Sequence, residues 1–178
     1  GVMACIKHFA GNNQEWDRHS VSSDIDERTR HEIYFPAFEA AVKEADVASV
    51  MTSYNLLNGV HASESKYLNY DILRDAWGFE GLVMSDWTSC YSPLNVATWG
   101  VDLEMPLPKS IKPEILHALV AKGALDVRFI DRKCQHIIQT ILSYEFDKRD
   151  QLDKSIPENN QYSDQVSHEV SREAIVML

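Results

Sequence analysis

Asp86 follows a short apolar run, a position from which a carboxylate can take part in proton transfer or nucleophilic attack. Residues 82–84 have the composition of a short buried strand, and Gly81 marks the turn before it. Asp is also a frequent helix N-cap. The spacing alone therefore leaves two interpretations of Asp86 open, a catalytic carboxylate and a cap.

Three other apolar runs also end in polar or reactive side chains. Parallel strands bring their carboxyl ends to one edge of a sheet, and α/β barrels carry their working residues at that edge. The sequence therefore predicts that the four strand ends lie together and form a site. The other runs and their closing residues are residues 2–9 with Lys7 and His8, residues 48–51 with Met51 to Tyr54, and residues 101–105 with Glu104.

The segments between these runs favour an α/β fold. Apolar spacing predicts helices over residues 27–45, 68–77 and 93–99, so strands and helices alternate as in a parallel sheet. An open doubly wound sheet usually carries a glycine-rich phosphate loop, and no such motif occurs here. We predict a partial (β/α)8 TIM barrel, roughly its last four strand–helix units, because 178 residues fall short of the roughly 250 in a complete barrel.

The end of the chain departs from this alternation. Two further helices, over residues 111–121 and 126–144, complete a predicted domain over residues 1–145. Residues 146–162 lose periodicity and are predicted to be a linker. Residues 163–178 resume a helical pattern that stops in mid-pattern, so we expect the truncated start of a following α/β domain.

The composition excludes several classes of function. A formal net charge of −10 argues against nucleic acid or an anionic membrane as partner and favours a neutral small substrate. The 3 cysteines lack CxxC spacing and the histidines lack metal-ligand spacing, so we expect no disulfide framework, metal or other cofactor. No apolar run approaches the roughly 20 residues that cross a bilayer, so we expect a soluble protein, either cytoplasmic or secreted.

Several motifs, taken in order, resemble glycoside hydrolase family 3 and most closely its β-glucosidases. The segment from Asp102 to Pro106 extends the resemblance, which is close over roughly the first 106 residues. The motifs are Lys7-His8-Phe9, Asn12-Asn13-Gln14-Glu15, Arg18, Met51-Thr52-Ser53-Tyr54-Asn55, Gly78-Phe79 and Val83-Met84-Ser85-Asp86-Trp87.

The resemblance implies a retaining glycosidase that hydrolyses terminal β-D-glucosidic bonds. Asp86 matches the family's nucleophile, and the acid/base is a glutamate that the family places in a following domain, outside these residues. A retaining mechanism needs the two carboxyl groups roughly 5 Å apart. Since Glu64 and Glu104 match no acid position, we expect the isolated chain to be inactive, and a half barrel with open edges to be unstable.

The resemblance also implies which residues bind the sugar. Basic side chains would donate hydrogen bonds to hydroxyls and hold Asp86 ionised. An aromatic face would lie against the pyranose ring. The implied partners are a small oligosaccharide or β-glucoside, together with an N-terminal half-barrel and a C-terminal domain. The positions that match substrate-binding residues are Lys7, His8, Arg18, Met51, Tyr54 and, for the aromatic face, Trp87.

Other functions remain open at this point. Within the family these are β-xylosidase and the β-N-acetylglucosaminidase branch, which takes its acid/base from an Asp-x-His pair that Asp17 and His19 superficially provide. The motif around Arg18 and the Ser-Asp-Trp sequence at Asp86 resemble the glucosidase branch instead. A carbohydrate-binding module without catalysis is the alternative from another class.

Overall fold

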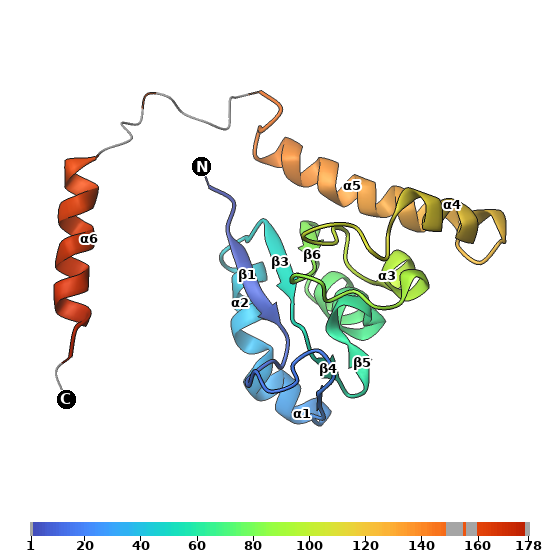
Figure 1. The fold of residues 1–178 in the computed structure, drawn as a ribbon, viewed down its shortest axis with the longest axis horizontal. Helices are drawn as coiled ribbons and strands as arrows, with labels where there is room; N and C mark the ends of the chain where they lie inside the picture. Colours follow the sequence, from blue (N-terminus) through green and yellow to red (C-terminus); the bar gives the residue numbers. More distant parts are fainter. Residues whose placement is uncertain (1, 149–154, 156–159, 177–178) are drawn as a thin grey trace. The chain divides into compact units, whose positions relative to one another are not determined.

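The computed structural model describes residues 2–148, 155 and 160–176 (Figure 1). The chain divides into two compact units, Gly1–Glu145 and Phe146–Leu178. The second unit contains helix α6 (Gln161–Ala174), which Asn160 caps by accepting the backbone N–H of Tyr162. Much of the predicted linker, residues 149–154 and 156–159, and the last two residues of the predicted final helix lie outside the described residues.

The first unit is built on a parallel sheet of three strands in the order β1-β3-β6, shown side by side in Figure 1. Strand β3 pairs with both neighbours, and Val50 at its centre lies opposite Val83 of β6. The fourth predicted strand is reduced to one parallel bridge between Met84 and Leu103. The α/β fold is confirmed, whereas half of a barrel stays a prediction. The strands are β1 (Cys5–Phe9), β3 (Ser49–Thr52) and β6 (Leu82–Met84).

A second, smaller sheet follows the carboxyl ends of β1 and β3. Its first two strands are parallel, and the last two form an antiparallel hairpin. The hairpin turns at Asn58 and Gly59, whose positive φ angles of 50° and 82° suit these residue types. The strands are β2 (Ser22–Ser23), β4 (Leu56–Leu57) and β5 (Val60–His61).

Residues 27–34 and 36–43 are helical, but the prediction of one unbroken helix over residues 27–45 is wrong. The segment begins where Asp26 caps it, with Oδ1 accepting the N–H of Thr29 at 3.0 Å, but it is interrupted before Pro36. Proline lacks the N–H of a regular helical turn, and its ring clashes with the preceding turn. The segment consists of α1 (Glu27–Thr29), the wider π-helical turn η1 (Arg30–Tyr34) and α2 (Pro36–Lys43).

Four later helices lie where the sequence predicts them, although η3 is π-helical, and the short 3₁₀ turn η2 is not predicted. Gly78, with φ 73°, follows helix η3 at the position where the sequence predicts that the helix ends. Asp126 caps the long helix α5 by accepting the N–H of Arg128 at 2.9 Å. None of the described helices is long and apolar enough to cross a membrane. The helices are η2 (Ala62–Glu64), η3 (Tyr67–Ala76), α3 (Pro93–Trp99), α4 (Pro113–Ala121) and α5 (Val127–Ser143).

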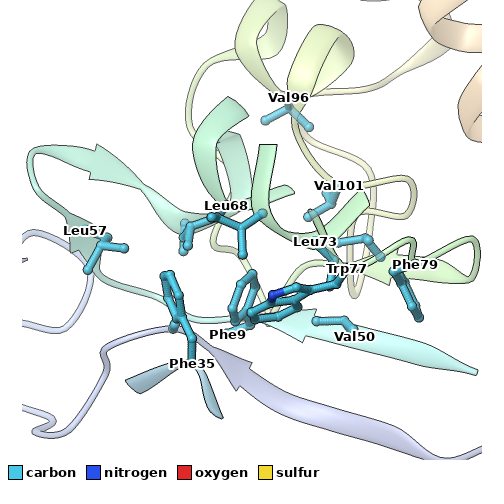
Figure 2. Packing of buried hydrophobic residues seen from close by; sticks show 14 of the residues in the cluster. Phe9, Phe35, Val50, Leu57, Leu68, Leu73, Trp77, Phe79, Val96 and Val101 are labelled. Atoms are coloured by element: carbon cyan, nitrogen blue, oxygen red, sulfur yellow. The ribbon is translucent and has the colours of Figure 1, made fainter. Parts of the chain in front are cut away.

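The hydrophobic core lies between the parallel sheet and its helices (Figure 2). Phe9, at the end of β1, is fully buried, and its ring centroid lies 5.6 Å from that of Phe35 and 5.5 Å from that of Trp77. Buried aromatic contacts of this kind each contribute about 0.5–1.5 kcal/mol beyond burial of their area. The core therefore fixes the carboxyl end of β1, where Lys7 and His8 are found.

Candidate active site

The carboxyl ends of β1, β3 and β6 meet at one edge of the sheet. Because the three strands are parallel and adjacent, the residues that close them gather there. His8 belongs to β1, Tyr54 follows β3, and Asp86 follows β6. These three strand ends gather as predicted, and the end of the fourth run lies beside β6, where the Met105 N–H donates to the Ser85 hydroxyl at 2.9 Å.

Groups from β1 and from the next residue hold the Asp86 carboxylate. Its Oδ2 lies 3.0 Å from Nε2 of His8, and its Oδ1 accepts the backbone N–H of Trp87 at 2.7 Å. The Asp86 residue is 8% exposed. Its carbonyl oxygen also accepts the Ser89 hydroxyl at 3.0 Å, so backbone and side chain are both fixed.

His8 contributes a hydrogen bond rather than a positive charge. Burial lowers the pKa of the His8 imidazole, and the Asp86 carboxylate only opposes that shift. The neutral ring therefore predominates near pH 7, and its proton lies on Nε2 because a carboxylate only accepts. A hydrogen bond donated to a carboxylate also favours its charged form, so the role of His8 in keeping Asp86 ionised stays a prediction.

Arg18 reaches the site through Tyr54. Its guanidinium carbon lies 3.9 Å from the centre of the Tyr54 ring, and Nη1 pairs with Glu15 at 2.6 Å. Tyr54 is 9% exposed, and its pKa is raised by burial and then by the neighbouring Asp86 carboxylate. Within the described part of the chain Arg18 pairs with Glu15 and not with Asp86, but the Asp86 carboxylate also helps to raise the Arg18 pKa, so its support of the Asp86 charge stays a prediction.

The other predicted substrate-binding residues offer free surface at the same edge. Lys7 is exposed and makes no hydrogen bond or ion pair with another described residue. Trp87 is 62% exposed. Met51 is half-buried on β3, opposite Met84. Lys7 and Trp87 thus offer exposed side chains on the segments that carry His8 and Asp86.

Glu64 and Glu104 are occupied by backbone groups. Glu64 is 7% exposed, and its Oε1 accepts two backbone N–H groups, those of Tyr91 and Ser92, at 2.7 Å each. Glu104 is 6% exposed, and its two oxygens accept three backbone N–H groups from residues 109–111. Both carboxylates hold loops, and the assignment of the acid to neither of them stays a prediction.

Sequence reasoning missed the part that His19 plays in the site. Its Nδ1 lies 2.7 Å from the hydroxyl of Tyr91, and its ring meets Tyr54 edge-on at 4.8 Å. No pattern in the sequence joins His19 to Tyr91, because the two residues are 72 positions apart on separate loops. The described residues contain no group of three or more His, Cys, Asp or Glu that could hold a metal ion.

The geometry therefore places a fixed aspartate at the edge of a parallel sheet, near exposed polar and aromatic groups. Residues 1–140 match the model of the glycosyl hydrolase family 3 N-terminal domain. The chain belongs to glycosyl hydrolase family 3.

Individual relatives agree with this assignment. A β-glucosidase from Rhizobium radiobacter is 46% identical over 138 residues, which cover 78% of this chain and 17% of that protein. An exo-α-(1->6)-L-arabinopyranosidase from Bifidobacterium breve is 41% identical, covering 100% of this chain and 23% of that protein. The structure of β-glucosidase 3B from Thermotoga neapolitana in complex with α-D-glucose superposes with a TM-score of 0.83 at 34% identity, covering 99% of this chain and 26% of that one. The chain thus spans about a quarter or less of these proteins.

Proposed function

We propose that this chain carries the nucleophile and part of the sugar site of an enzyme that hydrolyses terminal β-D-glucosidic bonds with retention. The observation that carries the proposal is the Asp86 carboxylate at the strand edge, oriented by His8 at 3.0 Å and by the Trp87 N–H at 2.7 Å. A carboxylate held in one orientation is prepared for attack at a fixed carbon.

The reaction proceeds in two displacements. An Asp86 oxygen attacks the anomeric carbon as the bond to the leaving oxygen breaks, and an acid protonates that oxygen, which leaves as an alcohol. The resulting glycosyl ester on Asp86 is then attacked by water, whose proton returns to the former acid. Two inversions at one carbon give net retention of configuration.

The substrate-binding roles follow from the exposed groups around Asp86. Lys7 has a free ammonium to donate to sugar hydroxyls, and the Trp87 indole offers an apolar face to a pyranose ring. Tyr54, with Arg18 stacked on its ring, neighbours the Asp86 carboxylate, and the half-buried Met51 on β3 would add apolar surface. His8 both orients Asp86 and borders the same space.

The acid/base glutamate comes from a segment beyond this chain. The carboxylates of Glu64 and Glu104 both accept backbone N–H groups. We therefore interpret residues 1–145 as the second half of a catalytic barrel, residues 146–162 as a linker and residues 163–178 as the start of a following domain. By the full-length protein we mean this chain together with segments equivalent to those that flank the matching part in its relatives. The isolated chain, without the acid/base glutamate, is proposed to be inactive.

The sugar specificity has alternatives within the family. His19 is hydrogen-bonded to Tyr91. This contact favours assignment to the glucosidase branch over an acid/base pair of Asp17 and His19. The arabinopyranosidase relative, similar over the whole chain, makes α-L-arabinopyranosides the second candidate substrate. β-Xylosides and β-N-acetylglucosaminides follow, and a module that binds sugar without hydrolysing it is the non-catalytic alternative.

The test uses the full-length protein and p-nitrophenyl glycosides of these sugars. The β-D-glucoside should have the highest kcat/KM, and proton NMR should show β-glucose as the first product. Asp86→Asn should lower kcat by at least about 10⁴-fold, as expected for loss of a central catalytic group. First-formed α-glucose would overturn the retaining mechanism, and sugar binding without hydrolysis would establish the non-catalytic alternative.

A further inference from the structure

His19 connects two loops that border the candidate site. Its Nδ1 lies 2.7 Å from the hydroxyl of Tyr91, in the segment that follows Asp86. The edge of the same imidazole meets the Tyr54 ring with a centroid distance of 4.8 Å and an interplanar angle of 68°. One histidine thus contacts a residue after β6 and a residue after β3.

Tyr91 is itself held firmly. Its ring stacks on His61 with a centroid distance of 3.8 Å and an interplanar angle of 20°. Its backbone N–H donates to the buried carboxylate of Glu64 at 2.7 Å. Burial raises the pKa of the Tyr91 phenol to about 12, so the hydroxyl keeps its proton at neutral pH. The Tyr91 hydroxyl is therefore a fixed point to which the loop of His19 is attached.

Arg18 is the immediate neighbour of His19 and lies over the same Tyr54 ring, with its guanidinium carbon 3.9 Å from the ring centre. Tyr54 is therefore contacted by two consecutive residues of one loop. If the loop lost its attachment to Tyr91, the stacked Arg18 and the edge-on His19 would both lose their fixed position against Tyr54. The sugar-binding face beside Asp86 would then be less ordered before the substrate arrives.

We propose that His19 and Tyr91 form a positioning pair that preorganises Arg18 and Tyr54 for sugar binding. The pair touches neither the anomeric carbon nor the Asp86 carboxylate, so it acts on affinity and not on the chemical step. This inference rests on the proposed function. It gives His19 a different role from that of an acid/base partner of Asp17.

The test is a split between KM and kcat for p-nitrophenyl β-D-glucoside in the full-length protein. Tyr91→Phe keeps the ring stacked on His61 and removes only the hydroxyl. Loss of a hydrogen bond of ordinary strength should raise KM about 3- to 10-fold, and kcat should stay within about twofold. Tyr70→Phe, which removes a hydroxyl from a buried ring that packs on Trp99, is the matched control and should change neither constant.

Two further variants separate a positioning role from a general loss of stability. His19→Asn keeps a polar group close to the Nδ1 position and should retain most of the affinity. His19→Phe keeps an aromatic edge against Tyr54 and should raise KM about as much as Tyr91→Phe. Because His19→Phe and Tyr91→Phe remove the same hydrogen bond, the double variant that carries both should have a KM no higher than either single variant.

The inference is overturned if Tyr91→Phe has the wild-type KM or if the two single effects multiply in the double variant. It is also overturned if His19→Phe lowers kcat by orders of magnitude, since that result assigns His19 to the chemical step. A wild-type protein that neither hydrolyses the glucoside nor binds D-glucose by calorimetry would contradict the proposed function itself, and the positioning role with it.

Discussion

His8 Nε2 and Asp86 Oδ2 lie 3.0 Å apart although strand β3 separates their two strands in the sheet. The ends of β1 and β6 therefore approach each other over the end of β3. The contact gathers the edge into one site, with Asp86 as its most buried titratable group among the residues proposed to act there.

Removing the His8 side chain should impair turnover without unfolding the protein. A hydrogen bond to a charged group contributes about 1.5–3 kcal/mol, so His8→Ala should lower kcat/KM about 10- to 150-fold in the full-length protein. His8→Gln, whose amide can reach the Nε2 position, should lose less. His117→Ala, at an exposed position on α4, is the control and should retain wild-type turnover. Equal kcat/KM for His8→Ala and wild type would contradict the assigned contact.

The ion pair between Arg74 and Asp102 should be important for stability. The two side chains are 10% and 1% exposed, and Asp102 also accepts Nδ1 of His136 at 2.8 Å and the Val83 N–H at 2.9 Å. Arg74→Met leaves the buried Asp102 carboxylate without its guanidinium partner, so it should lower the free energy of unfolding by about 3–5 kcal/mol in urea denaturation.

Arg128→Met provides the matched control for this prediction. Arg128 pairs with Asp126 at 2.7 Å, but the two side chains are 83% and 42% exposed. Exposed pairs contribute at most about 1 kcal/mol. Similar losses in the two variants would show that burial does not determine the strength of the pair.

The buried Lys133 side chain should make the free energy of unfolding depend on pH in the alkaline range. Burial lowers its pKa from 10.5 to about 8, and its ammonium donates to the carbonyls of Gly100 and Val101 at 2.8 Å each. Between these two pKa values the unfolded chain binds more protons than the folded protein, so this group's contribution to stability rises with pH. The free energy of unfolding of wild type relative to Lys133→Met should rise by up to about 3 kcal/mol from pH 8 to 10.5.

The comparison with Lys133→Met at each pH is essential. Burial raises the pKa of Cys90 and of Tyr91 to about 12, and these groups lower stability as pH rises. Their effect is common to both proteins and cancels in the difference. Urea denaturation at several pH values measures it, and a difference that does not change with pH would refute the predicted titration of Lys133.

The strand that delivers Asp86 could be predicted because its signal is local. A three-residue apolar run followed by an acid became β6 (Leu82–Met84) with Asp86 at its end. The interruption before Pro36 also has a local signal, the proline itself. Apolar spacing alone predicts an unbroken helix there. The fourth run became a single bridge at Leu103 because a short apolar run does not specify how much of it pairs.

The contacts that complete the candidate site could not be predicted because they join distant loops. Arg18 has charged residues near it in sequence, but its stacking on Tyr54 depends on how the two loops fold. His19 and Tyr91 carry no motif that pairs them. The protonation of His8 likewise depends on its burial, which its position at a strand end does not reveal.

The most direct test of the account is covalent trapping of the nucleophile. The full-length protein is incubated with 2,4-dinitrophenyl 2-deoxy-2-fluoro-β-D-glucoside, whose electron-withdrawing fluorine slows hydrolysis of the glycosyl ester more than its formation. Peptide mass spectrometry should place one fluoroglucosyl group on Asp86, and Asp86→Asn should give no adduct. A fluoroglucosyl group on another residue, or none on a folded protein that hydrolyses β-glucosides, would contradict the assignment of Asp86.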